Sequence, residues 1–409
     1  MGIADRLGAV RRLGTELWGG GRGPILVAVA GGWFLSLGVR MIYPAVLPQL
    51  RAAYGLDLTA AGLLVTALWV AYALGQLPGG LLDDRFGGGR VLVASTAVSA
   101  VALAVVVTAG SVGVLFGATL LFGFATALYG VARFTILSDN YPERGGTAIG
   151  LTMAAGDLGS SVLPPLAGAL VVAVAWQLGF GFAIPLFALA AVGIGIVVPS
   201  ARRDAETDAS EAGVGEAFRA VAGVMTDRSV LLVTAVQLLG YCVWQGFTGF
   251  YPTYLVEVKG LAQTTATALF GGFFGLGILV KPMAGSAYDA YGLRRSLPLV
   301  LLVITASMAL VPVVEGLAAI AAVTALASSV LGYATITLTY LTGAFPDEVR
   351  GTGLGVLRTG YMLVGAASPT VVGALADRGY FDESFFLLAG VGAVAALLAI
   401  RVPDRTADT

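Results

Sequence analysis

Long apolar stretches separated by short polar ones run along this chain from residue 25 to residue 402. Each stretch holds about 20 or more residues, the length that a helix needs to cross a bilayer. The stretches show little amphipathic periodicity, as expected of helices that face lipid on one side and protein on the other. The pattern predicts membrane-spanning helices at 25–49, 59–82, 90–110, 112–138, 146–171, 179–199, 229–255, 264–288, 296–314, 316–344, 352–375 and 384–402.

Composition strengthens the membrane assignment. Of the 409 residues, 57% are hydrophobic and 11% are charged, and the mean hydropathy is +0.89. A soluble chain carries about a quarter charged residues. Histidine is absent and Cys242 is the only cysteine, which excludes a disulfide within the chain and removes the commonest zinc ligand. We therefore expect an all-α membrane protein with no catalytic residue, no metal and no cofactor.

One connection is much longer than the others. Residues 200–228 are polar and acidic, and they divide the spans into six and six. The expected organisation is an N-terminal segment (1–24), a six-helix half (25–199), a linker (200–228), a second six-helix half (229–402) and a tail (403–409). With both termini cytoplasmic, sixteen basic residues fall in cytoplasmic segments and three outside. Because cytoplasmic loops carry an excess of Lys and Arg, we expect this orientation in a cell (inner or plasma) membrane.

The two halves repeat each other at an offset of 205 residues. The segment Gly80–Gly87 after the second span matches Gly285–Gly292 after the eighth. The same offset relates spans five and eleven, where it pairs Gly150 with Gly355, Pro164 with Pro369 and Gly168 with Gly373. The prolines of these two spans are expected to interrupt their helices, either as hinges between the halves or as packing kinks.

The turn after the second span carries a motif. Gly80, Asp84, Arg85 and Gly87 match Gly-x-x-x-Asp-Arg-x-Gly-x-Arg, although Gly89 stands at the last basic position and Arg90 follows it. This motif resembles the signature of the major facilitator superfamily, and the resemblance covers essentially the whole chain. It implies two six-helix repeats around a central cavity, with Asp84 and Arg85 as a working pair. We expect a cytoplasmic gate in which Asp84 faces the N-terminus of a neighbouring helix. The residues of this gate, from both copies of the motif, are Asp84, Arg85, Asp289 and Arg294. An ordinary solvated turn is the alternative.

Five ionisable residues lie well inside the predicted spans: Arg40, Arg133, Asp157, Lys281 and Arg358. A charge at mid-membrane costs about 2.5–3.5 kcal/mol, so these side chains should face the protein interior or a wet cavity. The resemblance places all five spans around the cavity or between the halves. If Arg133 and Asp157 pair across adjacent helices, three positive charges remain, and a bound anion is their natural complement.

Several of these residues have two possible roles. Asp157, the only carboxylate well inside a span, fits both a proton-coupling role and a fixed ion pair with Arg133. Arg133 and Arg358 lie near the cytoplasmic ends of their spans, where their side chains could instead reach water. Polar and aromatic residues could shape a pocket or serve as interface anchors: Tyr43, Trp69, Tyr72, Gln76, Gln237, Tyr241, Trp244, Gln245, Tyr333, Tyr340 and Tyr361.

Together these features predict a secondary active transporter that moves a small organic anion, expected to be a carboxylate, by alternating access. Arg40, Lys281 and Arg358 are the expected anion ligands, and basic residues in spans eight and eleven resemble those of oxalate–formate and monocarboxylate-type porters. Proton coupling and exchange both stay open. The alternatives are a multidrug or metabolite efflux transporter and a non-transporting membrane receptor. The expected partners are the solute, the lipid bilayer and, if coupled, protons, with no nucleic acid; we expect a monomer.

Overall fold

The computed structural model describes residues 17–199, 219, 221–345 and 350–403. Within these residues, twelve helical segments are long and apolar enough to cross a membrane, which confirms the expected number and order of spans. Most of the expected N-terminal segment, linker and tail lies outside the described residues.

The N-terminal half holds the first six spans, and the sixth is formed by two helices in series. After a short 3-10 helix, η1 (Gly19–Gly21), its helices are α2 (Gly23–Ala45), α3 (Leu47–Tyr54), α4 (Leu58–Phe86), α5 (Gly88–Val107), α6 (Val112–Asn140), α7 (Gly145–Ala173), α8 (Leu178–Gly181) and α9 (Ala183–Val197).

The C-terminal half repeats this order, with its tenth and eleventh spans each broken into two helices. Its helices are α11 (Arg228–Glu257), α12 (Gln263–Tyr291), α13 (Leu293–Val313), α14 (Leu317–Ala327), α15 (Val330–Thr342), α16 (Arg350–Gly365), α17 (Ser368–Ala376) and α18 (Phe381–Ile400).

Two glycines end corresponding helices of the two halves in the same way. Gly87 follows α4 with φ of +83° and Gly292 follows α12 with φ of +73°. Glycine adopts this left-handed region without steric cost, so each chain turns into the next span within one residue. Their separation of 205 residues agrees with the repeat seen in the sequence.

The expected proline interruptions are right for one span and wrong for the other. α7 runs unbroken through Pro164 and Pro165. The eleventh span does break, between Gly365 and Ser368, and Pro369 lies in the first turn of α17. Neighbouring helices can satisfy the backbone groups that a proline frees, which is why α7 tolerates two of them.

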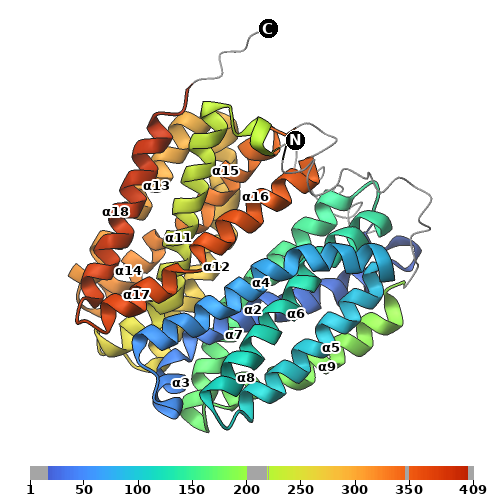
Figure 1. The fold of residues 1–409 in the computed structure, drawn as a ribbon, viewed down its shortest axis with the longest axis horizontal. Helices are drawn as coiled ribbons and strands as arrows, with labels where there is room; N and C mark the ends of the chain where they lie inside the picture. Colours follow the sequence, from blue (N-terminus) through green and yellow to red (C-terminus); the bar gives the residue numbers. More distant parts are fainter. Residues whose placement is uncertain (1–16, 200–218, 220, 346–349, 404–409) are drawn as a thin grey trace, which may run out of the picture.

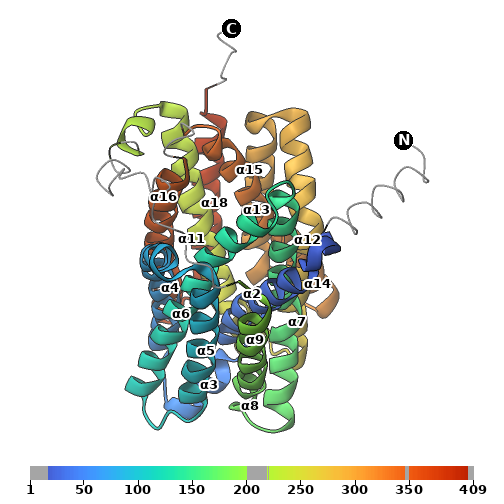
Figure 2. The ribbon, with the colours of Figure 1, turned by 90° about the vertical axis from the view of Figure 1, so that its right-hand side faces the viewer.

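The two halves form adjacent bundles, coloured blue to green and yellow-green to red in Figure 1. They meet where α7 packs on α12, α4 on α16 and α17, and α2 on α11. The helices α5 and α9 lie on the outer side of the N-terminal half, nearest the viewer in Figure 2. These are the third and sixth spans, which the family resemblance places at the periphery.

Each bundle has two ends that matter for the site. The end holding Phe86, Val197 and Arg228 adjoins the linker between the halves and is called here the linker end. The end holding Ala45, Leu58 and Glu257 is called the far end.

Candidate functional site

A cavity of about 250 Å³ lies between the two halves, close to the middle of the spans. The N-terminal half contributes α2 and α7 to its wall, and the C-terminal half contributes α11, α12, α15 and α16. The expected site residues that line it are Asp157, Gln237, Tyr241, Trp244, Lys281, Tyr333, Arg358 and Tyr361. Its volume suits a small solute, since sites for drug-sized ligands measure roughly 300–1,000 Å³.

An ion pair joins the two halves at the wall of this cavity. The Lys281 Nζ of α12 lies 2.7 Å from each carboxylate oxygen of Asp157 on α7. The two side chains keep 32% and 16% of their surface exposed, so the pair borders the open space. The expected pairing of Asp157 with Arg133 is therefore wrong. Asp157 lies on the face of α7 that packs against α12, whereas α6, which carries Arg133, has little contact with α7.

Arg133 instead lies over an aromatic ring. Its guanidinium carbon is 3.5 Å from the centre of the Trp33 ring and 4.3 Å from that of Phe134. The residue is only 2% exposed, so its side chain does not reach water at the linker end. Contact with an aromatic face stabilises a buried cation without neutralising its charge.

Arg40 is enclosed in the same way. Its guanidinium carbon lies 3.9 Å from the centre of the Tyr72 ring and 5.1 Å from that of Trp69, and the residue is 1% exposed. The Nε donates to the carbonyl of Ser36 at 2.9 Å. Both terminal nitrogens are buried with no hydrogen-bond acceptor among the described residues.

Tyr72 connects Arg40 and Arg133 with the third interior arginine, Arg358. It interacts electrostatically with all three, which are called here the arginine cluster. Arg358 interacts further with Tyr241 and Tyr361, and within the described chain no carboxylate forms an ion pair with any of the three arginines. Three interior positive charges thus lack a negative partner, which agrees in number with the sequence-based count, although the paired cation is Lys281.

Arg358 also marks the boundary between two cavities. Besides the central one, it lines a space of about 350 Å³ between α4 and α6 of one half and α16 of the other. This second cavity extends toward Gly351 at the linker end and holds Gln76 in its wall. Arg358 is therefore the arginine of the cluster that reaches open space on both sides.

Aromatic side chains close the central cavity. Trp244 of α11 contacts Trp69 of α4 edge to face, with ring centres 5.3 Å apart, across the boundary between the halves. Tyr241 packs on both Trp244 and Tyr361, at 5.4 and 5.2 Å. Tyr333 completes this wall and donates to the backbone carbonyl of Gln237 at 3.4 Å. These rings shape an apolar surface beside the charged groups.

Six expected pocket residues do not line the central cavity: Tyr43, Trp69, Tyr72, Gln76, Gln245 and Tyr340. Gln76 lines the second cavity, and Tyr340 lines a separate space at the linker end of the C-terminal half. Tyr43 is fully buried in the core of the N-terminal half, between Phe122 and Phe180. Gln245 is buried on α11, outside the lining of the central cavity, and its amide has no hydrogen-bond partner among the described residues. A tyrosine or glutamine in a span does not show from sequence which side of its helix faces the cavity.

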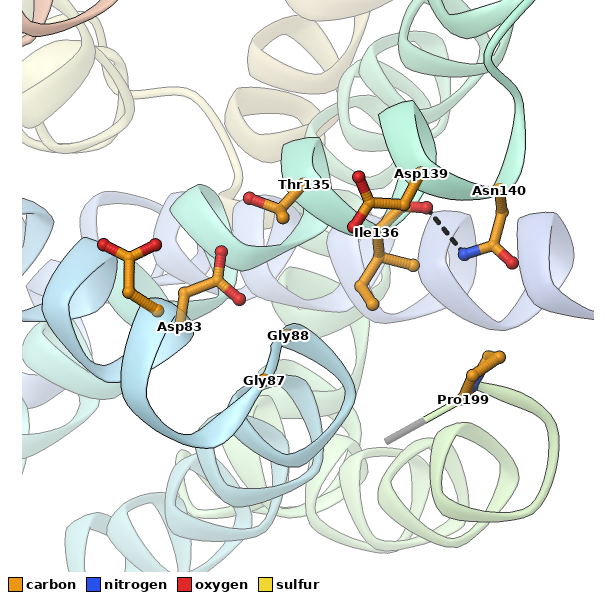
Figure 3. A pocket seen from close by; sticks show the side chains of 9 residues that line it. Asp83, Gly87, Gly88, Thr135, Ile136, Asp139, Asn140 and Pro199 are labelled. Carbon is orange, nitrogen blue, oxygen red and sulfur yellow. Dashed lines mark hydrogen bonds between the residues drawn. The ribbon is translucent and has the colours of Figure 1, made fainter. Parts of the chain in front are cut away.

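In the first half, the expected gate pair of Asp84 and Arg85 lies at the linker end and forms no ion pair in the described chain. Asp84 is exposed. The neighbouring Asp83 is the buried carboxylate, and Figure 3 shows it beside Gly88 at the start of α5, facing Asp139 of α6. In the second half, Asp289 and Arg294 are likewise exposed.

The far end holds a contact that the sequence analysis missed. Asp377, just after α17, accepts hydrogen bonds from the backbone amides of Leu58 and Thr59 at 2.8 and 2.6 Å, and from the Thr59 hydroxyl. Asp377 thus places a carboxylate at the N-terminus of α4 in the other half, where the helix dipole favours negative charge. Asp377-Arg378-Gly379 resembles the Asp84-Arg85-x-Gly87 turn, and this similarity was the available signal.

Two further contacts join the halves near Asp377. Arg51 of α3 forms an ion pair with Glu257 of α11, and the side-chain amide of Gln263 donates to the carbonyl of Ala45. All three contacts lie at the far end.

Comparison with known proteins agrees with this architecture. The family model described as Major Facilitator Superfamily matches residues 28–336 and 260–409. A probable sulfoacetate transporter of Cupriavidus necator is 27% identical, over 92% of this chain and 94% of the relative. The hexuronate transporter of Bacillus subtilis is 26% identical over 87% and 88%, and a cis,cis-muconate transport protein of Acinetobacter baylyi is 25% identical over 88% and 90%.

Solved structures show the same fold. A bacterial homologue of the human lysosomal transporter Spinster, in an inward-facing and unoccupied conformation, superposes with a TM-score of 0.78 at 15% identity, covering 92% of this chain and 96% of the other. A nucleoside transporter gives 0.78 at 14% identity, over 93% and 100%. The chain is therefore a multi-pass membrane transporter, not an enzyme, and it belongs to the major facilitator superfamily.

Proposed function

We propose that this protein is a secondary active transporter of a small organic anion, which binds between the halves in the central cavity. The observation that carries the proposal is the arginine cluster, in which Arg40 and Arg133 are buried, Arg358 lines the cavity, and none of the three has a carboxylate partner in the described chain. Uncompensated buried charge is costly, and an anion on Arg358 offsets part of that cost. Arg40 and Arg133 lie behind aromatic rings and act on the bound anion through their field.

The relatives support the same class of solute. Three relatives are named as transporters of sulfoacetate, hexuronate and cis,cis-muconate. Each of these compounds is an organic acid that is an anion at neutral pH. Each relative covers most of this chain. An efflux transporter for cationic drugs fits the cavity poorly, because the one carboxylate at its wall, Asp157, is already paired with Lys281.

The orientation and the coupling ion are further parts of the proposal. The excess of basic residues on the linker side supports cytoplasmic termini in a cell membrane. Asp157 is the candidate proton carrier, because it borders the cavity and its partner Lys281 belongs to the other half. Protonation of Asp157 would break a link between the halves.

Counterflow in proteoliposomes tests the class of solute. The purified full-length protein, loaded with one organic acid, should take up labelled organic acids and leave cationic dyes outside. Arg358→Gln should lower the apparent affinity for the acid about tenfold or more, since it removes a charge-assisted hydrogen bond to the acid. Gly360→Ala, on the same helix with open space around it, is the matched control. Uptake of cationic dyes without exchange of any acid would reject the proposal.

Proton coupling is tested separately. Asp157→Asn should abolish uptake driven by a pH gradient and leave exchange of solute for solute intact. An unchanged response to the pH gradient would remove Asp157 from the coupling role without affecting the assignment of the solute.

A further inference from the structure

The ion pair of Asp157 and Lys281 continues a very close contact between α7 and α12. A side-chain carbon added to Gly271 would lie 2.3 Å from the carbonyl oxygen of Ser161, so the two backbones nearly touch there. Asp157 lies one turn from Ser161 toward the linker end, and Lys281 lies in the same direction from Gly271. The ion pair therefore extends the link between the halves to the wall of the cavity.

The cavity thus presents two cationic groups that differ in their counter-ions. Arg358 interacts with tyrosines and with the rest of the arginine cluster, without a carboxylate among its partners in the described chain. Lys281 is neutralised by Asp157. Both line the same cavity of about 250 Å³.

Charge compensation distinguishes two kinds of solute. The ionisable groups well inside the spans are four cations and one anion, a net charge of three. A monoanion on Arg358 leaves two charges uncompensated and the ion pair intact. A second acidic group on the same solute could replace Asp157 on Lys281, because the first group already holds the solute in place. The displaced Asp157 carboxylate then remains at the cavity wall, where 16% of its side chain is exposed and can be hydrated.

We propose that the solute is a dianion with two acidic groups, one bound by Arg358 and the other displacing Asp157 from Lys281. This inference rests on the proposed transport of organic anions and deepens it. Because Asp157 and Lys281 belong to different halves, displacement breaks a link between them. The second acidic group is then the part of the solute that allows the halves to move, and a monoanion of the same shape lacks it.

The test compares a diacid with an ester that differs by one charge. Purified full-length protein in liposomes is assayed by counterflow with muconate and succinate, and with the monomethyl ester of each. The wild-type protein should favour each diacid over its ester by about tenfold or more, the value of one charge-assisted interaction. This comparison needs no variant.

A double substitution that leaves the interior net charge unchanged then tests whether Lys281 binds the second acidic group of the solute. Asp157→Asn combined with Lys281→Gln preserves the interior net charge and should reduce the ratio of diacid uptake to ester uptake, measured in the same variant, to less than about threefold. Lys259→Gln is the matched control, because Lys259 is the only other lysine and donates to the Pro312 carbonyl at the far end. It should keep the full preference. Lys281→Arg, which can still pair with Asp157, should keep it as well.

The outcomes separate this inference from the proposed function. Equal transport of diacids and esters by the wild-type protein would overturn the dianion assignment and leave organic-anion transport standing. A preference that survives the double substitution would overturn the role of Lys281. Failure to exchange any of the acids, with uptake of cationic dyes, would instead reject the proposed function itself.

Discussion

The two ends of the boundary between the halves are built differently. At the far end the halves touch directly, through Asp377 on the N-terminus of α4, the ion pair of Arg51 with Glu257, and Gln263 on the Ala45 carbonyl. Toward the linker end a cavity of about 350 Å³ separates α4 and α6 from α16. In the described residues, the structure is therefore shut at the far end and has a cavity between the halves toward the linker end.

The far end is held by contacts that can separate. Two backbone approaches bring the halves together there: a side-chain carbon added to Gly373 would lie 2.2 Å from the Leu58 carbonyl oxygen, and one added to Gly62 would lie 2.4 Å from that of Pro369. Around them are hydrogen bonds, one ion pair and buried apolar side chains, and Leu58 and Phe250 of the two halves belong to the same hydrophobic cluster. Alternating access needs such an interface, because it must form and break in every cycle.

The largest expected effect comes from closing the space at Gly373. Gly373→Ala places a methyl group against the backbone of α4, which cannot move away without separating the halves. Overpacking of this kind costs about 1–3 kcal/mol, or roughly 5- to 150-fold in the population of the shut far end. Spin labels at the exposed Ala53 and Val258, in a Cys242→Ser background, should report a longer distance across this end.

The same span supplies the control for this prediction. Gly360→Ala adds a methyl group where no other heavy atom lies within 4 Å, so the distance and the counterflow rate should stay as in the parent protein. A Gly373→Ala protein with an unchanged distance would show that the close approach does not hold the far end shut.

A smaller effect is expected from the carboxylate of Asp377. Burial alone would raise its pKa, but hydrogen bonds from Thr59 and the amide of Leu58, with the charge of Arg51 nearby, hold the pKa below its usual value. The pKa is thus lower when the far end is shut than when it is open. The carboxylate therefore stabilises the shut end at neutral pH, and this contribution is lost as the pH falls through the lowered pKa.

Asp377→Asn should lower the population of the shut far end roughly three- to tenfold, because charge-assisted hydrogen bonds at an exposed site are partly screened. In the parent protein the same spin-label distance should be constant near neutral pH and lengthen below about pH 4. The Asn variant should lack that step. A step of equal size in both proteins would assign it to another group.

Features that depend on local sequence could be predicted, whereas contacts between the two halves could not. The spans and the glycine turn at Gly87 were predictable, because bilayer thickness and positive φ act on local sequence. Lys281 and Arg358 were predictable as interior groups because a charge facing lipid is too costly. The partner of Asp157 was not, because it depends on how α7 is rotated and on contact with a helix of the other half. Asp377 lies outside the spans, so no cost of burial marked it.

The linker end gives the third prediction. Asp84 is exposed here and has no partner in the described chain, so Asp84→Asn should not weaken the present state. If Asp84 faces a helix N-terminus when the linker end is shut, its loss should favour the present state about two- to fivefold. The far-end distance should then stay short in a larger fraction of molecules. If Asp84→Asn instead lengthens the far-end distance, Asp84 stabilises the present state and not the state with the linker end shut.

The smallest effect is expected from Arg51 and Glu257. Their side chains are 21% and 32% exposed, and an exposed ion pair contributes about 0.2–1 kcal/mol. A double-substitution cycle with Arg51→Gln and Glu257→Gln should therefore give a coupling of at most about fivefold in the shut population. Arg51 also acts on Asp377, so Arg51→Gln alone should have a larger effect than Glu257→Gln alone. Added salt should reduce the coupling, since surface charges are screened beyond about 10 Å at 0.1 M. If the two single substitutions change the shut population equally, Asp377 acts without Arg51. If these changes do not depend on salt, the two residues stabilise the far end by packing and not by charge.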